Sequence, residues 1–207
     1  MKRCIIVGAG SIYDGDLPFT TKEDDLIIAA DGGYWALQQA GMTPHLLIGD
    51  FDSMERPEVT CETLTLPVEK DDTDLVYAVK EGFARGYKTF VLYGGLGGKR
   101  LSHTLANLQL LAYIKEQGGD GVLMGGNTRV YLLKEEERTF SAPQNTHCSV
   151  LAFGGEATVS SCGLYYPMEK TVLTDRFPLG VSNHFVTKTA TLTVHQGSVV
   201  VIVEKSI

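Results

Sequence analysis

Carboxylates follow several short apolar runs of this sequence at close spacing. Asp50 and Asp52 stand two residues apart near the end of the stretch LLIGDFDS, residues 46–53. Side chains alternate across a strand, so these two carboxylates can lie on the same side of the backbone. Like charges held so close repel each other, and a bound divalent cation would remove the repulsion. The spacing therefore suggests a metal site after this run.

Further aspartates stand in comparable positions. Asp31 follows another apolar run in AADGG, and the segment KDDTD contains Asp71, Asp72 and Asp74. If the runs are parallel strands, their carboxyl ends share one sheet edge, where these side chains gather. Mg²⁺ prefers oxygen ligands, usually one or two carboxylates together with substrate phosphates. Each aspartate alone is better explained as a turn former or, with Thr73, as part of a helix cap, so the metal hypothesis depends on their number.

A glycine-rich, basic stretch supplies the opposite charge. It reads YGGLGGKRLSHTLAN, residues 93–107, and follows an apolar run. Glycines let backbone amides approach an anion, Lys99 and Arg100 add positive charge, and a helix beginning near Ser102 directs its positive end there. Tyr93 and Arg100 break the P-loop pattern, which requires glycine and a hydroxyl residue at these positions. The stretch suggests a polyphosphate site, although a plain loop with an exposed basic pair explains it equally well.

An acidic, metal-binding edge beside a basic glycine loop is suited to moving a phosphoryl or pyrophosphoryl group from a nucleotide. Positioning and neutralisation of charge provide most of the catalysis in such transfers. His103 lies just inside the expected helix and is a candidate nucleotide contact, but packed or solvated histidines are at least as common. These residues alone do not name the acceptor.

The elements that must position these groups belong to two parts of the chain with different sequence patterns. Over residues 1–132, apolar runs alternate with helical periods, which predicts an α/β domain with a mostly parallel, Rossmann-like sheet. Over residues 133–207, short β-prone runs between turn residues predict a small all-β sandwich or barrel, with a hairpin turn at HQGS, residues 195–198. The charged run KEEER near the boundary is explained equally well as a linker or as a solvated strand edge. The apolar runs of the first part are residues 4–10, 26–33, 45–52, 62–67, 88–95 and 121–126.

Composition excludes several classes of protein. The 207 residues carry a formal net charge of -7, which argues against a general nucleic-acid binder. The four cysteines show no CxxC spacing, so neither a zinc ribbon nor a redox pair is predicted. No run approaches the roughly 20 apolar residues of a membrane span. We therefore expect a cytoplasmic protein without nucleic-acid or membrane partners.

Five motifs resemble the bacterial thiamine pyrophosphokinase (thiamine diphosphokinase) family, and together they extend over nearly the whole chain. The resemblance implies transfer of the pyrophosphate group of ATP to the hydroxyl of thiamine, giving thiamine diphosphate and AMP. It also implies a homodimer, with each site between the N-terminal domain of one subunit and the β-rich domain of the other. The motifs, in order, are DGG (31–33), GDFDS (49–53), KDDTD (70–74), GGKRLSHTLAN (97–107) and GVSNHF (180–185).

The resemblance also implies roles for individual residues. Residues 1–132 would form the nucleotide- and metal-binding catalytic domain, and residues 133–207 the thiamine-binding domain. The implied catalytic residues and Mg²⁺ ligands are Asp50, Asp52 and Asp74; the implied ATP contacts are Asp31, Asp71, Thr73, Gly97, Gly98, Arg100 and His103; and the implied thiamine contacts are Ser182 and Asn183.

The basic loop departs from the family pattern GGRxDH. Here GGKRLSH has an additional residue, Lys99, and Ser102 stands where the family has an acidic side chain. Two alternatives to the kinase remain open at this point. One is a thiamine- or nucleotide-binding sensor that has lost turnover through the change at Ser102, and the other is a different metal-dependent nucleotide transferase with a DxD pair.

Overall fold

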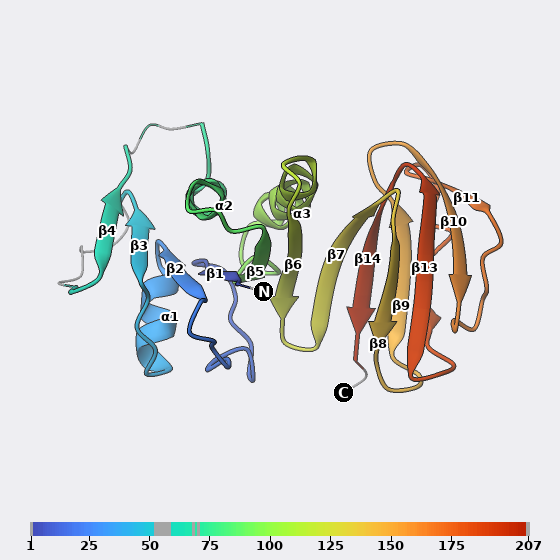
Figure 1. The fold of residues 1–207 in the computed structure, drawn as a ribbon, viewed down its shortest axis with the longest axis horizontal. Helices are drawn as coiled ribbons and strands as arrows, with labels where there is room; N and C mark the ends of the chain where they lie inside the picture. Colours follow the sequence, from blue (N-terminus) through green and yellow to red (C-terminus); the bar gives the residue numbers. More distant parts are fainter. Residues whose placement is uncertain (1, 52–58, 68, 70, 206–207) are drawn as a thin grey trace. The chain divides into compact units, whose positions relative to one another are not determined.

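The computed structural model describes residues 2–51, 59–67, 69 and 71–205, and it divides the chain into two compact units (Figure 1). Unit 1 is Met1–Gly126 and unit 2 is Asn127–Ile207. The division falls in the turn between β6 (Asp120–Gly125) and β7 (Thr128–Lys134), whereas a division after residue 132 would fall inside β7. The pairing of β7 with β14 (Ser198–Glu204) keeps the whole of β7 in unit 2.

The strands of unit 1 lie in the order β6-β5-β1-β2-β3-β4, and each pairing between these neighbours is parallel. The central strands are buried on both faces, which explains why they read as continuous apolar runs. Chain order reverses at β1, because β2 lies on one side of it and β5 on the other. Ligands bind at such a switch point, beyond the carboxyl ends of the strands. The remaining strands of this unit are β1 (Cys4–Val7), β2 (Leu26–Ala30), β3 (Leu46–Gly49), β4 (Glu62–Thr65) and β5 (Thr89–Tyr93).

Helices cover the sheet of unit 1 on both faces. Tyr34 and Leu37 of α1 share an apolar cluster with Ile5 and Val7 on one face. On the other face α2 lies so close that a Cβ on Gly82 would stand 2.6 Å from the ring of Phe90. The helical periods expected between the apolar runs of residues 1–132 are confirmed. The helices are α1 (Gly33–Gln39), α2 (Asp74–Ala84) and α3 (Leu101–Glu116).

Unit 2 is built from antiparallel strands in two layers. One layer has the order β12-β9-β14-β7 and the other β11-β10-β13-β8. Val150 and Val201 from the first layer share a core cluster with Val159 and Leu192 from the second. The β-rich C-terminal part expected from the sequence is confirmed. The other strands are β8 (Glu137–Ser141), β9 (His147–Ala152), β10 (Glu156–Cys162), β11 (Thr171–Thr174), β12 (Asn183–His184) and β13 (Thr189–Gln196).

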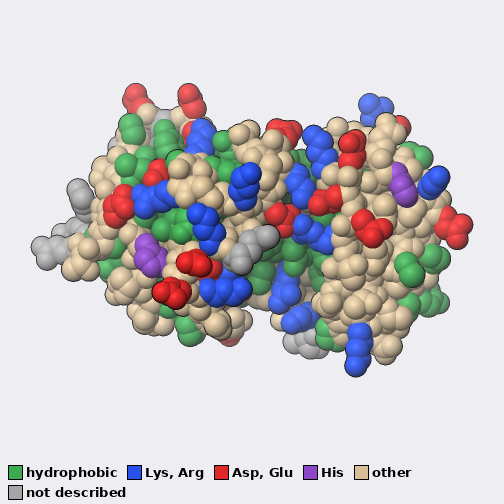
Figure 2. Space-filling model, in the orientation of Figure 1, with side chains coloured by type: hydrophobic (Ala, Val, Ile, Leu, Met, Phe, Trp, Pro, Cys, Tyr) green, Lys and Arg blue, Asp and Glu red, His purple; other side chains and the backbone are tan. Residues whose placement is uncertain are grey.

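The predicted hairpin joins β13 to β14, and Gly197 at its turn has a φ of 78°, a value that favours glycine. No helix in the described part of the chain is long and apolar enough to cross a membrane. On the face shown in Figure 2, basic and acidic side chains are interspersed over the surface.

Candidate active site

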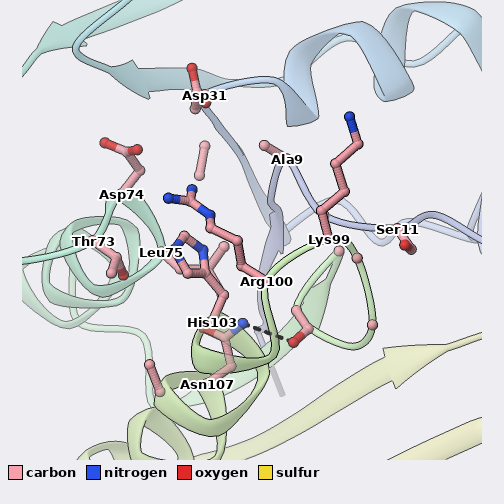
Figure 3. A pocket seen from close by; sticks show the side chains of 17 residues that line it. Ala9, Ser11, Asp31, Thr73, Asp74, Leu75, Lys99, Arg100, His103 and Asn107 are labelled. Atoms are coloured by element: carbon pink, nitrogen blue, oxygen red, sulfur yellow. Dashed lines mark hydrogen bonds between the residues drawn. The ribbon is translucent and has the colours of Figure 1, made fainter. Parts of the chain in front are cut away.

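A cavity of about 520 Å³ lies beyond the carboxyl ends of β1, β2 and β5, at the switch point of the unit 1 sheet. Its walls are the segments after these strands and the first turns of α2 and α3 (Figure 3). Cavities of this size hold small-molecule ligands. The lining residues are Ala9, Gly10, Ser11, Ala30, Asp31, Thr73, Asp74, Leu75, Gly94, Gly95, Gly97, Gly98, Lys99, Arg100, His103, Ala106 and Asn107.

Backbone forms the part of the wall where the segments after β1 and β5 meet. A Cβ on Gly10 would lie 2.1 Å from the carbonyl oxygen of Gly94, and one on Gly94 would lie 2.4 Å from that of Gly8. Gly94 also has a φ of 69°, in the left-handed region. No side chain fits at these contacts. The cavity is therefore lined here by main-chain groups, which a ligand can approach closely.

Helix α3 holds the segment after β5, residues 94–100, which we call the cavity loop. Asn107 Nδ2 donates a hydrogen bond of 2.8 Å to the Gly95 carbonyl oxygen, and Thr104 Oγ1 donates one of 3.3 Å to that of Gly97. Gly97 and Gly98 have φ values of 71° and 89°. The loop thus turns back onto the first turns of α3 and stays attached to them.

Positive charge enters the cavity from this loop and from the start of α3. Figure 3 shows the Arg100 guanidinium extending between the acidic wall and His103, while the Lys99 side chain extends away from His103. No ion pair joins Lys99 or Arg100 to another side chain among the residues the structure describes. The first turn of α3 adds the positive end of a helix dipole. This part of the cavity is suited to a multiply charged anion.

Two carboxylates form the opposite wall, Asp31 after β2 and Asp74 at the start of α2. The backbone turns sharply at Asp31, where φ is 50°, and its N–H donates to the Ile48 carbonyl oxygen at 2.7 Å. Thr73 caps α2, because its hydroxyl accepts from the Val76 N–H at 3.3 Å. The Oδ1 atoms of Asp31 and Asp74 are both buried. Carboxylate oxygens on a wall facing an anion site fit the ligand preference of Mg²⁺.

Two other residues predicted for this site have described positions but do not line the cavity. Asp50 follows β3 and does not line the cavity, and Asp71 is exposed before α2. Asp52 lies outside the described residues. Among the residues with described positions, no three His, Cys, Asp or Glu side chains stand close enough to form a metal site. The described part of the predicted acidic edge therefore consists of two cavity carboxylates, with Asp50 at a neighbouring strand end.

The predicted thiamine contacts lie in unit 2 and differ in their surroundings. Ser182 is exposed and has a φ of 60°. Asn183 is 5% exposed, and its Oδ1 accepts from the N–H groups of Tyr166 and His184, each at 3.0 Å. Its Nδ2 donates to the Tyr166 carbonyl oxygen at 2.7 Å. The Asn183 side chain thus has a structural role, which its sequence motif did not indicate.

Ser11 and Asn107 line the cavity but were missed as site residues. Ser11 follows Gly8 and Gly10, whose spacing does not fit a dinucleotide fingerprint and so gives no local signal of a site. Asn107 is 9% exposed in the middle of a helical period. A polar residue at a position of the helical period that is otherwise apolar was the signal in the sequence that could have indicated a role for Asn107.

The fold and the cavity define the class of this protein, an α/β ligand-binding unit with an anion-adapted site at its switch point, followed by a β-rich unit. Residues 19–121 match the family model described as thiamin pyrophosphokinase, catalytic domain. Residues 131–199 match the model described as thiamin pyrophosphokinase, vitamin B1 binding domain. The chain belongs to the thiamin pyrophosphokinase family.

Individual relatives agree with this assignment. The thiamine pyrophosphokinase of Bacillus subtilis is 27% identical in an alignment of 206 residues, and the match covers 96% of this chain and 96% of that protein. A crystal structure of the Bacillus subtilis protein has a TM-score of 0.87 at 22% identity and full coverage of both chains. A family protein from Enterococcus faecalis has a TM-score of 0.84 at 25% identity, covering 99% of this chain and 100% of its own. The family reaction, ATP-dependent formation of thiamine diphosphate, is the reaction of this chain, and neither the sensor nor another transferase is favoured.

Proposed function

We propose that the cavity of unit 1 is the ATP site and that ATP gives its pyrophosphate group to the thiamine hydroxyl there. The observation that carries this proposal is the pairing of two cavity walls, one with Arg100 and backbone glycines and one with Asp31 and Asp74. A nucleotide polyphosphate needs both walls, because cations and amides bind its oxygens while carboxylates hold its metal ion. The cavity lies at the switch point of the unit 1 sheet, where Rossmann-like folds bind nucleotides, and this position supports the proposal.

Each group has a role that follows from its chemistry. Arg100 can bind two phosphate oxygens in a planar fork, and Lys99 adds a point charge at the cavity wall. Asp31 and Asp74 would hold Mg²⁺, joined by Asp50 and Asp52 as the family motif implies. Bound Mg²⁺ would neutralise phosphate charge and orient the transferred group. The cavity loop and the start of α3 would hold the pyrophosphate group in place while AMP leaves.

We place thiamine binding in unit 2, where the vitamin B1 binding model matches. The exposed Ser182 hydroxyl is available to a polar ring such as the aminopyrimidine, since a hydroxyl both donates and accepts. The inward bonds of Asn183 support an indirect role, in which it shapes the segment around Ser182.

We further propose a cytoplasmic homodimer with sites shared between subunits. Leu101 and Leu105 of α3 are 73% and 55% exposed, so each subunit has apolar surface that a second copy can cover. All four cysteines are free thiols, which supports a reducing compartment.

The first experiment measures AMP and thiamine diphosphate formed from ATP and thiamine, with Mg²⁺ present or chelated. We expect equal amounts of both products with Mg²⁺, and loss of both with chelator. Arg100→Met should raise the KM for ATP, whereas Arg176→Met, an exposed control in unit 2, should not. Unchanged ATP use by Arg100→Met would contradict the assignment of the ATP site to this cavity.

Mixing two inactive variants tests the shared site. Asp74→Asn should inactivate the unit 1 half-site and Ser182→Trp the unit 2 half-site. In an equal mixture that exchanges subunits, heterodimers combine one intact half-site from each chain, and activity should return to about a quarter of wild type. No recovery, despite heterodimers seen by native mass spectrometry, would place each complete site within one subunit.

A further inference from the structure

We propose that Asp16 and Tyr13 form a clamp that positions the cavity loop for ATP. Neither residue lines the cavity, and the inference rests on the proposed ATP site. Both belong to the connection between β1 and β2, which contributes Ser11 to the cavity wall. Asp16 is therefore a positioning residue, which acts through the groups that it holds.

The Asp16 carboxylate joins two segments that are far apart in sequence. The residue is 4% exposed, and its Oδ1 accepts from the Gly126 N–H at 2.8 Å. Its Oδ2 accepts from the Tyr13 N–H at 2.9 Å, while the Asp16 N–H donates to the Tyr13 carbonyl oxygen at 3.0 Å. A buried carboxylate is stable only when donors replace its lost water, and here backbone groups do so. The carboxylate thus ties the β1–β2 connection to the residue after β6.

Tyr13, held in this way, places its ring against glycines from two other segments. A Cβ on Gly97 would lie 2.3 Å from the Tyr13 hydroxyl, and one on Gly125 would lie 3.2 Å from Cε2 of the ring. Gly97 is in the cavity loop, and its carbonyl oxygen also accepts a hydrogen bond from Thr104 of α3. Helix α3 and Tyr13 therefore both contact the loop at Gly97.

This arrangement predicts an effect on ATP rather than on thiamine. Loss of one Asp16 oxygen leaves a buried backbone N–H without its acceptor, which favours movement of Tyr13. The cavity loop then has more conformations available, and ordering it around phosphate costs binding free energy. Unit 2, where we place thiamine, has no part in these contacts.

The test compares Asp16→Asn with wild type in the full-length enzyme. The amide directs an NH₂ group toward one of the two N–H donors, so we expect the KM for ATP to rise about tenfold. The KM for thiamine should stay within about twofold, and the Kd of a non-hydrolysable ATP analogue should rise with the KM for ATP. Tyr13→Ala should act in the same direction, and Tyr13→Phe should raise the KM for ATP less, because it keeps the ring but removes the hydroxyl beside Gly97.

Two matched controls separate positioning from general stability. Asp14→Asn removes the same charge from an exposed neighbour and should change neither KM. Asp25→Asn removes another buried carboxylate, whose partners Arg3 and Lys22 do not line the cavity, so it should lower the Tm but not affect ATP.

The clamp is refuted if Asp16→Asn behaves like Asp25→Asn, or if it raises both KM values equally. If Asp16→Asn does not fold, Tyr13→Ala decides by the same criteria, because that side chain is 43% exposed. Failure of the clamp is distinguishable from failure of the ATP site. In the first case Arg100→Met still weakens ATP binding, and in the second it does not.

Discussion

Asn107 and Gly95 are joined by a buried hydrogen bond of 2.8 Å, from the Asn107 amide nitrogen to the Gly95 carbonyl oxygen. The bond connects α3 to the cavity loop, and both residues line the cavity. The geometry of the proposed phosphate site therefore depends on a neutral side chain as well as on its charges.

We expect Asn107→Ala to destabilise the protein by about 1–3 kcal/mol, because it leaves a buried carbonyl oxygen without its donor. The KM for ATP should rise as the loop loosens. Asn107→Asp should be worse at neutral pH, since it sets a carboxylate against that carbonyl. Urea unfolding and initial rates measure both effects, with the exposed Gln109→Ala on the same helix as the control. Equal stability of Asn107→Ala and this control would disprove the role of the bond.

Asp74→Asn should lower kcat by about 100-fold, because it removes charge stabilisation at the proposed metal site. The Mg²⁺ concentration needed for half activity should rise with it. Asp72→Asn is the matched control, since Asp72 lies in the same acidic segment but is ion-paired with Lys80. Mg²⁺ titrations of both variants decide the matter, and similar losses for the two would argue against a specific metal role. Asp52→Asn, predicted from the sequence to act like Asp74→Asn, belongs in the same series.

Ser182→Ala and Asn183→Ala should separate substrate contact from structure. Ser182→Ala should raise the KM for thiamine with little change in stability, because Ser182 is exposed. Asn183→Ala removes three hydrogen bonds from a buried position and should cost more than about 1 kcal/mol. Thermal unfolding and thiamine kinetics test the pair. A stable Asn183→Ala with a raised KM for thiamine would instead make Asn183 a direct contact.

Stability should fall at acid pH partly through Asp25. The hydrogen bond from the Arg3 side chain holds the pKa of Asp25 below its usual value, against the effect of burial. The unfolded chain binds the Asp25 proton at a higher pH than the folded chain does, so this stabilisation is complete above about pH 5 and declines below about pH 4. Asp25→Asn should be less stable at pH 7 and lose less on acidification. Urea unfolding from pH 7 to pH 3 measures the difference, and parallel curves for variant and wild type would contradict it.

The cysteines should react with a thiol reagent in an order set by burial. Burial raises the pKa of Cys4 and of Cys148 to about 12, so neither forms much thiolate near neutral pH. Cys162 is exposed and should react first, followed by the partly buried Cys61, whose pKa burial also raises. Mass spectrometry of alkylated peptides at pH 8 gives the order. Modification of Cys148 before unfolding would show that its strand opens in the native state.

Local patterns predicted much of the architecture because each depends on neighbouring residues. The fully buried strands of unit 1 appear as unbroken apolar runs, and one of the helical periods between them is α2, with Thr73 as its cap. The hairpin at Gly197 was readable for the same reason, since its conformation favours glycine. The hydrogen bonds of the Asn183 side chain could not be predicted, because their partner, Tyr166, is 17 residues away and no local pattern connects the two.

The sequence by itself determined the division into an α/β part and a β-rich part, the order of the family motifs and the presence of acidic and basic groups at strand ends. Only the tertiary structure decided which of these groups meet. Asp31 and Asp74 share a cavity with Arg100, and Ser11 and Asn107 join them. The physical reason is that strand order is set by long-range pairing. Placing β1 between β2 and β5 brings segments about 85 residues apart into contact at Gly10 and Gly94, and no local spacing carries that information.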